Sequence, residues 1–236
     1  MHRQTPDTPD SPKRLIDTAY ELLRSDIVQC RLKPGEQVSE AHLAQRYGLG
    51  KAPIRSALSR LCQERLVEPL ARRGHRVARL TIRDVIDVFE MRIILEPKAA
   101  RMAAGRIGGS VLDRLAEICR QEYRLGDPVS RAIYLQATYE LHATIANASG
   151  NWRLAVAIIQ HLDESQRIRH LGLAGADINR TARAQHLALL AAIREGDGDR
   201  AEAISHEHLQ TARKLFVDEL INHPSILDRD AKLGSA

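Results

Sequence analysis

The chain has 236 residues, of which 3% are aromatic and 44% hydrophobic, and it carries a formal net charge of +5. This length accommodates one or two domains, the scarcity of aromatic residues favours helices packed on helices over a sheet sandwich, and no apolar run approaches the roughly 18–20 residues that span a bilayer. The first 79 residues hold 15 Lys and Arg against 9 Asp and Glu, whereas the other 157 hold 20 against 21, so the excess positive charge lies in the first third and predicts a polyanionic partner there.

The start of the chain and its cysteines indicate the compartment. Residues 1–12, MHRQTPDTPDSP, are polar and proline-rich and lack the apolar segment of a signal peptide. Cys30, Cys62 and Cys119 form no CxxC pair, and we interpret them as buried small apolar residues in a reducing environment. We therefore expect a cytoplasmic protein with no membrane partner and a disordered extension over residues 1–12.

A long helix followed by a short one is predicted next. Apolar residues recur with a helical period over residues 13–31. Pro34-Gly35 marks a turn, Ser39 offers an N-cap, and Gly48 ends the short helix that Ser39 begins.

The stretch KAPIRSALSRL, residues 51–61, predicts a further short helix. Pro53 fits its first turn because the missing N–H would have no intrahelical partner there. At 100° per residue, one face is apolar and carries Ile54, Ala57, Leu58, Leu61 and Cys62. The opposite face is small, polar or basic and carries Ala52, Arg55, Ser56 and Ser59, with Lys51 just ahead of the helix. Two short helices joined by a tight turn, the second with a polar-basic outer face, form a helix-turn-helix.

The segment LVEPLARRGHRVARL predicts a β-hairpin wing, because two strand-like runs flank a basic turn around Gly74. Residues 13–79 are therefore expected to be a winged helix-turn-helix domain that binds double-stranded DNA. The expected DNA-contacting residues are Lys51, Pro53, Arg55, Ser56 and Ser59 on the helix, and Arg72, Arg73, Gly74 and His75 in the wing. On these residues alone, a three-helix module without a DNA function is the alternative.

From residue 80 onward the pattern is helical. Thr81 and Asp84 resemble a capping box, which marks a helix start and a domain boundary near Leu80. Helices are expected at about 83–105, 110–125, 129–148, 152–172, 178–195 and 198–222. The expected fold class is therefore mainly α: an N-terminal winged helix-turn-helix, a C-terminal all-α bundle of about six helices over residues 80–222, and a tail at 223–236.

Three histidines of this bundle are expected to face its interior: His142, His186 and His208. Each has aliphatic residues at helical spacing on its own predicted helix. One inward histidine is usually a core residue, but three on three helices favour a metal or effector site, since neutral imidazoles are the commonest metal ligands. His206 is expected to point elsewhere.

The sequence resembles a known family in both halves. The segment PGEQVSEAHLAQRYGLGKAPIRSALSRLCQERLVEPLARRGHRV resembles the winged-helix pattern of the GntR family of bacterial transcription regulators. The helical part resembles the FCD subgroup of that family, on the motifs FEMRIILEPKAARMAA, LHATIANASGN and HLALLAAIREGD…HEHL, which occur in the same order. The resemblance covers residues 15–220 and implies a dimeric DNA-binding regulator with an effector-binding domain, most commonly a repressor.

The resemblance also implies positions that contact DNA. These are Gly50, Lys51, Pro53 and Arg55 at the recognition helix, and Arg73 and Gly74 in the wing. The usual Ser/Thr-Arg pair of the family is replaced by Gly50-Lys51, and Ala41 replaces an arginine that often contacts DNA. Lysine meets a phosphate but lacks the bidentate fork that reads guanine, so the operator is expected to differ from the common sites of the family.

The FCD subgroup typically holds a divalent metal with an Asp or Asn and three histidines, and the resemblance implies that these histidines are His142, His186 and His208. The carboxylate position is Thr138 here, and a neutral hydroxyl is a poor ligand for a divalent ion. Three arrangements are open. The histidines could hold zinc, nickel or manganese with water or effector completing the shell; another carboxylate could substitute; or the histidines could bind an anionic effector without a metal.

Arg92 and Glu96 in MRIILE match a further pair of the subgroup. They are expected to form an intrahelical ion pair on a partly buried face. Arg92 is also a candidate, with the three histidines, for binding an effector carboxylate. Trp152 is expected to pack in the core.

These features predict a homodimeric repressor that binds a pseudo-palindromic operator and senses a small carboxylate metabolite, with or without a divalent metal. A metal-dependent hydrolase with a DNA-binding appendage is the first rival; however, no HExxH spacing occurs among the three histidines, and no acidic residue is expected on the pocket face as a general base. An effector-independent architectural DNA protein is the second rival, and it leaves the inward histidines unexplained.

Overall fold

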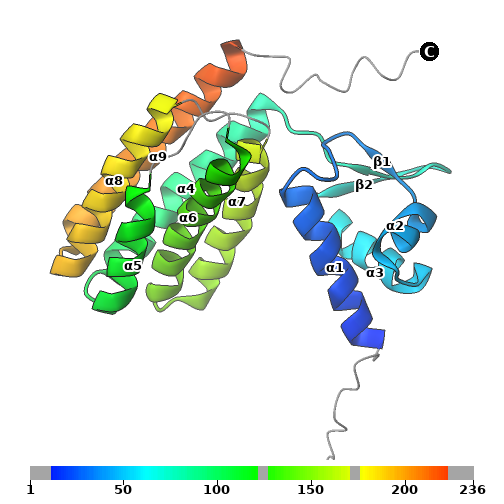
Figure 1. The fold of residues 1–236 in the computed structure, drawn as a ribbon, viewed down its shortest axis with the longest axis horizontal. Helices are drawn as coiled ribbons and strands as arrows, with labels where there is room; N and C mark the ends of the chain where they lie inside the picture. The colour runs from blue at the N-terminus through cyan, green and yellow to red at the C-terminus, as the bar shows by residue number, and fades with distance from the viewer. Residues whose placement is uncertain (1–11, 122–126, 171–175, 223–236) are drawn as a thin grey trace, which may run out of the picture. The chain divides into compact units, whose positions relative to one another are not determined.

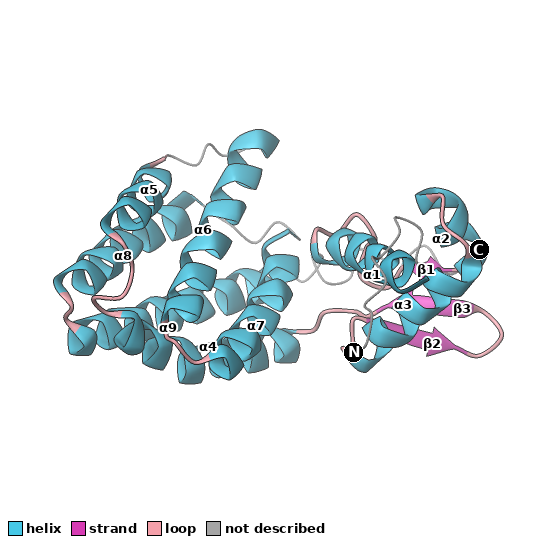
Figure 2. Ribbon diagram, turned by 90° about the horizontal axis from the view of Figure 1, so that it is seen from below, coloured by secondary structure: helices cyan, strands magenta, loops and turns pink. Residues whose placement is uncertain are grey.

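The computed structural model describes residues 12–121, 127–170 and 176–222, which divide into two compact units between Leu80 and Thr81. Both units are drawn in Figure 1, and Figure 2 shows that the strands drawn belong to the first. The predicted extension at 1–12 lies outside the described residues except for Pro12, which begins the first helix, and the predicted tail at 223–236 lies outside them entirely.

The first unit combines helices with short strands. Its elements are α1 (Pro12–Val28), β1 (Gln37–Val38), α2 (Glu40–Tyr47), α3 (Lys51–Gln63), β2 (Val67–Leu70) and β3 (Gly74–Val77). Strand β3 lies between β1 and β2 and is antiparallel to both. The sequence predicts α1, the α2–α3 pair and the hairpin, but not β1, because two residues are too short to show a strand pattern.

Local capping sets the bounds of the helix-turn-helix. The Ser39 hydroxyl accepts a hydrogen bond from the His42 N–H at 3.1 Å, which caps α2 as predicted. Gly48 ends α2 with a φ of 65°, a left-handed conformation that favours glycine. Gly50 takes the N-cap position of α3, so Lys51 is the first residue of the helix and not, as expected, just ahead of it. Pro53 lies in the first turn.

The core of the first unit forms where α1, α2 and α3 meet the sheet, and it includes Leu23, Leu43, Ile54, Leu58 and Val77. Burying these side chains supplies the main free energy that holds the unit together. A polar cluster lies beside this core and ties α1 to α2.

Asp26 of α1 is the centre of that cluster. Its carboxylate accepts hydrogen bonds from Arg31 Nε at 2.6 Å and from Arg46 Nη2 and the Tyr47 hydroxyl, each at 2.7 Å. Burial opposes ionisation of Asp26, but the hydrogen bonds from Tyr47 and Arg31 outweigh it and lower the pKa of the carboxyl group. The ionised carboxylate therefore joins α1 to the end of α2 through Arg46 and Tyr47.

The second unit is an all-α bundle, as predicted. Its helices are α4 (Ile82–Ala103), α5 (Gly109–Arg120), α6 (Pro128–Ala148), α7 (Trp152–His170), α8 (Ala176–Glu195) and α9 (Gly198–Asn222). A reciprocal capping box of Thr81 and Asp84 begins α4. Helix α4 packs against α6, α7 and α9, while α8 packs against α5 and α9. Small residues such as Ala99 and Ala100 let the neighbouring helices approach α4 closely.

Two expectations about burial are wrong. Trp152 has an exposed fraction of 65% because it opens α7 where no described element covers it, whereas the sequence predicts core packing. Cys30, Cys62 and Cys119 are half-buried and not buried. No helix among the described residues is long and apolar enough to cross a membrane.

We predict that Asp26→Asn lowers the free energy of unfolding of the first unit by about 2 kcal/mol at pH 7, because the charge that three donors share is lost. A lowered folded-state pKa stabilises the protein above the ordinary carboxyl pKa of about 4, and this contribution is lost as the pH falls through the folded value. The difference in the free energy of unfolding between wild type and Asp26→Asn should therefore shrink below about pH 4. Urea unfolding of the full chain followed by circular dichroism measures it.

The exposed residue Asp17 on the same helix offers the matched control, Asp17→Asn. Equal unfolding midpoints for Asp26→Asn and Asp17→Asn would contradict the role of Asp26.

Candidate functional sites

The outer face of α3 is available to a partner. Lys51, Arg55, Ser56 and Ser59 are exposed, and Pro53 is half-buried. The opposite face packs into the core of the first unit. The helix is thus held by its apolar side, and its polar-basic side faces solvent.

The wing combines exposed arginines with a glycine that the backbone requires. Arg72 and Arg73 are exposed in the turn between β2 and β3, whereas Gly74 and His75 are half-buried. Gly74 has a φ of 83°, and a Cβ atom there would lie 2.6 Å from the carbonyl oxygen of Val38. Glycine at this position is therefore needed for the pairing of β3 with β1, apart from any contact with DNA.

Glu40, which the sequence analysis did not single out, lies among the predicted DNA-contacting residues. Arg55 donates to it twice, from Nε to Oε1 at 2.9 Å and from Nη2 to Oε2 at 2.7 Å. These hydrogen bonds outweigh partial burial and lower the pKa of the Glu40 carboxyl group, and the charges of His75 and Lys51 lower it further. The pairing of Val38 in β1 with His75 in β3 brings the wing beside the start of α2.

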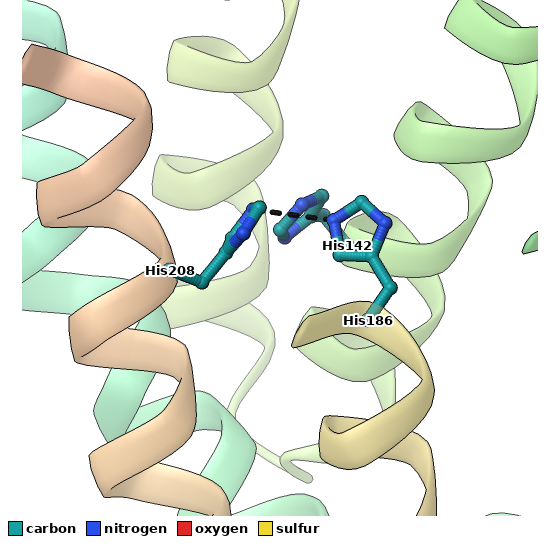
Figure 3. A group of neighbouring side chains, drawn as sticks. All are labelled: His142, His186 and His208. Carbon is teal, nitrogen blue, oxygen red and sulfur yellow. Dashed lines mark hydrogen bonds between the residues drawn. The ribbon is translucent and has the colours of Figure 1, made fainter. Parts of the chain in front are cut away.

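A triad of histidines lies inside the bundle. His142 of α6, His186 of α8 and His208 of α9 are each 2–3% exposed, and one ring nitrogen of each lies within 4.8 Å of the others (Figure 3). The Nε2 atoms of His186 and His208 are 3.2 Å apart. The structure therefore brings together the three residues that were expected to face inward, two from the consecutive helices α8 and α9 and one from α6.

Hydrogen-bond acceptors behind two of the rings orient them. The Nδ1 atom of His142 lies 2.7 Å from Oε2 of Glu96, and Nδ1 of His208 lies 3.0 Å from Oε1 of Gln185. We assign the proton of both rings to Nδ1, so that each Nε2 is the unprotonated nitrogen; that of His208 is then placed to accept a hydrogen bond from Nε2 of His186 when no other ligand is bound. The Nε2 atom of His142 is buried with no hydrogen-bond partner in the described structure.

Glu96 is fully buried, and this corrects two expectations. Its carboxylate accepts hydrogen bonds from Arg92 Nε at 2.5 Å and Arg92 Nη2 at 3.4 Å, while Arg92 Nη1 donates to Ser165 of α7 at 3.2 Å. Arg92 is 1% and Glu96 4% exposed, so the pair is not on a partly buried face. Moreover, an acidic residue does contact the triad. The sequence shows the four-residue spacing of the pair, but its burial depends on α6 and α7.

The three imidazoles are neutral at pH 7. Burial lowers the pKa of His142 despite the nearby Glu96 carboxylate, and burial lowers the pKa values of His186 and His208 well below the ordinary value. The positive charges of Arg92 and Arg169 act in the same direction. Burial also opposes the ionisation of Glu96, but Arg92 and His142 outweigh it and lower the pKa of its carboxyl group.

Thr138 does not take the place of a charged ligand. It is 5% exposed and lies one turn before His142 on α6, but its hydroxyl donates to the carbonyl oxygen of Tyr134 at 3.0 Å. The hydroxyl is therefore bound to its own helix and contributes no negative charge.

The donor set fits a divalent transition-metal ion. A tetrahedral ion with bonds of about 2.0–2.1 Å to two imidazole nitrogens separates those nitrogens by about 3.3 Å. The corresponding atoms of His186 and His208 are 3.2 Å apart, and a ring nitrogen of His142 lies within 4.8 Å of the other two residues' ligand atoms. Neutral imidazoles with acceptors behind them are the usual state of metal-binding histidines.

Two family descriptions and several relatives match the chain. Residues 15–77 match "Bacterial regulatory proteins, gntR family", and residues 87–211 match "FCD domain". The "HTH-type transcriptional repressor GlaR" of Escherichia coli strain K12 is 28% identical over 206 residues, which cover 81% of this chain and 91% of that protein. The "HTH-type transcriptional repressor RspR" of the same strain is 26% identical over 192 residues, which cover 81% of this chain and 84% of that protein.

Solved structures share the fold. Escherichia coli McbR/YncC superposes with a TM-score of 0.74 at 21% identity, and a putative transcriptional regulator GntR from Rhodococcus sp. RHA1 with a TM-score of 0.71 at 18% identity. Each superposition covers 87% of this chain and 98% of the other. The matched family and the two curated relatives are transcriptional regulators and not enzymes, so the metal-dependent hydrolase is not supported. With its winged helix and its helical bundle both matched, the chain belongs to the gntR family of bacterial regulatory proteins and carries the FCD domain.

Proposed function

We propose that this DNA-binding regulator is a homodimeric repressor whose helical bundle senses a small carboxylate metabolite. The observation that carries the proposal is the buried triad of neutral imidazoles, whose nitrogens converge inside a domain that is joined to a winged helix. An effector acts on DNA binding only as far as its affinities for the DNA-competent and DNA-incompetent states differ.

A divalent metal would be held by His142, His186 and His208. When bound, it supplies a positive charge and a coordination position for an anionic oxygen. Thr138 offers no carboxylate, so three neutral imidazoles leave the charge of the ion uncompensated, which favours an anionic effector. Because manganese prefers oxygen ligands and imidazole suits zinc and nickel, the donor set favours zinc or nickel.

The surroundings of the triad also favour an anion. Arg92 and Arg169 are buried, and their positive charges lower the pKa values of the triad histidines. The Arg92 guanidinium contacts Glu96 and Ser165, so we assign it the role of holding Glu96 in place and place the effector at the histidines.

For the first unit, we propose that the exposed face of α3 enters the major groove and that the wing contacts the backbone. Lys51, Arg72 and Arg73 would meet phosphates, while Arg55 would reach base edges. Two protomers would read the two halves of a pseudo-palindromic operator. Several large apolar side chains on α4 and α7 are exposed, and a second copy of the bundle would cover them: Met91, Ile94, Trp152 and Val156.

Repression is the mode that the names of the relatives suggest, since GlaR and RspR are both called transcriptional repressors. We place the protein in the cytoplasm, where the operator DNA of a bacterium lies.

We predict that Arg55→Ala weakens binding to the operator in a gel shift by at least about tenfold, because a bidentate base contact contributes about 1–3 kcal/mol. The operator is first selected with wild-type protein from random duplexes. Arg200→Ala, which removes the same charge from an exposed position of α9, serves as control. Unchanged operator binding by Arg55→Ala, with the bundle still folded by circular dichroism, would exclude α3 as the recognition helix.

We predict about one zinc or nickel ion per chain in wild-type protein purified without chelator, measured by ICP-MS. His208→Ala should lose the metal because one of the three ligands is removed. His206→Ala should keep it, since His206 is exposed two residues away on the same helix. Wild-type protein that stays metal-free after incubation with divalent ions would overturn the metal site and leave direct binding of an anion by the histidines as the arrangement to test.

We predict that one or more small carboxylates raise the melting temperature and weaken operator binding. At a concentration of a hundred times Kd, the effector should stabilise the protein by about 2.7 kcal/mol. Thermal unfolding and fluorescence anisotropy across a carboxylate panel measure this, with the corresponding neutral amides as controls. Operator binding that no carboxylate changes would favour an effector-independent DNA-binding protein.

A further inference from the structure

We propose that Glu40 determines the specificity of the DNA-contacting surface by holding the Arg55 guanidinium side-on, so that the free end of its fork meets a guanine. The inference rests on the proposed role of α3 in reading the operator and adds a residue to it that does not touch a base itself. Glu40 is thus a positioning residue that acts through Arg55.

The contact between Glu40 and Arg55 leaves the N–H groups at the end of the guanidinium free to donate to a base. Glu40 accepts from Nε and Nη2, at 2.9 and 2.7 Å, along one side of the guanidinium. The remaining N–H groups, on Nη1 and on the outer side of Nη2, form the end of the fork. This end can still donate in parallel to O6 and N7 of guanine, the commonest specific contact in the major groove. The Arg55 side chain is 69% exposed, so this end of the fork is open.

The carboxylate is itself held in place from the backbone. Glu40 lies in the first turn of α2, where Ser39 caps the helix, and a helix N-terminus stabilises a negative charge. Strand β1 immediately precedes this turn and is paired with β3. Glu40 is only 24% exposed in its side chain, so it is a firmer support for Arg55 than a freely mobile surface glutamate.

Arg55 differs in this respect from the other arginines of the surface. Arg72 and Arg73 have no ion pair among the described residues, and both are exposed in the turn of the wing. Exposed cations of this kind meet the phosphates of DNA of any sequence. An arginine that is already held in one orientation loses little side-chain entropy when it binds. It therefore favours DNA that presents a pair of hydrogen-bond acceptors at one position.

The charge of Glu40 adds to the discrimination. A carboxylate on a DNA-facing surface repels phosphates, so it disfavours binding to every duplex. A duplex with guanine at the right position offsets this repulsion through Arg55, whereas other duplexes do not. Without the carboxylate, Arg55 would be free to pair with phosphates, and binding to unrelated DNA would become tighter.

The test compares wild type, Glu40→Gln, Arg55→Ala and the double variant on the selected operator and on a shuffled duplex of the same composition. Fluorescence anisotropy at one fixed salt concentration gives both Kd values, and thermal unfolding confirms the fold of each full-length variant. We expect Glu40→Gln to tighten binding to the shuffled duplex. The ratio of the Kd for the shuffled duplex to the Kd for the operator should therefore fall by about tenfold. In the Arg55→Ala background, Glu40→Gln should leave the ratio unchanged.

Glu68→Gln is the matched control, because Glu68 is exposed on β2 of the same unit and its substitution changes the net charge equally. It should shift both affinities alike. A second readout replaces single operator guanines by 7-deazaguanine, which lacks the N7 acceptor. One such replacement should weaken wild-type binding and leave Arg55→Ala unaffected.

The possible failures are distinguishable. If Arg55→Ala binds the operator as wild type does, the proposed role of α3 fails and this inference fails with it. If Arg55→Ala loses the operator but Glu40→Gln keeps the wild-type ratio, only the role of Glu40 is overturned. The same conclusion follows if Glu68→Gln lowers the ratio as much as Glu40→Gln does.

Discussion

The burial of the Glu96 carboxylate is the constraint on which the polar centre of the bundle depends. A carboxylate inside a protein is tolerated only with cationic or hydrogen-bonding partners, and Glu96 has Arg92 on its own helix and His142 on α6. Arg92 in turn donates to Ser165 of α7. One buried charge thus ties three helices together and fixes the orientation of the His142 ring, whose Nε2 is left without a partner among the described residues.

In both candidate sites a carboxylate contacts the side chain that is proposed to bind a partner. Glu96 contacts His142, and Glu40 contacts Arg55. The two carboxylates differ in environment and therefore in what they contribute. The exposed pair of Glu40 and Arg55 adds little to the stability of the fold, because water screens an ion pair at the surface, so its main effect is on the direction of the arginine. The buried Glu96 carboxylate is out of reach of water, so Arg92 and His142 must supply its hydrogen bonds. These contacts join α4 to α6, and Arg92 also joins α4 to α7.

The excess positive charge of the chain lies in the first of its two structural units. The first unit is basic and exposes its cations on α3 and the wing, which suits a polyanion. The bundle is nearly neutral overall, yet it buries arginines beside three imidazoles that burial keeps unprotonated. Thr138 adds no negative charge to this interior, which is the basis on which we propose an anionic effector there.

Local rules in the sequence determined the helices, the hairpin and the inward direction of the three histidines. Caps such as Ser39 and Thr81 act within a turn of the chain, and the helical period alone separates the buried face of α3 from its exposed one. The exposure of Trp152, the burial of Glu96 and the pairing of Glu40 with Arg55 were decided only by the tertiary structure. Each depends on which distant segment covers or approaches a side chain, and the periodicity of one helix contains no information about its neighbours.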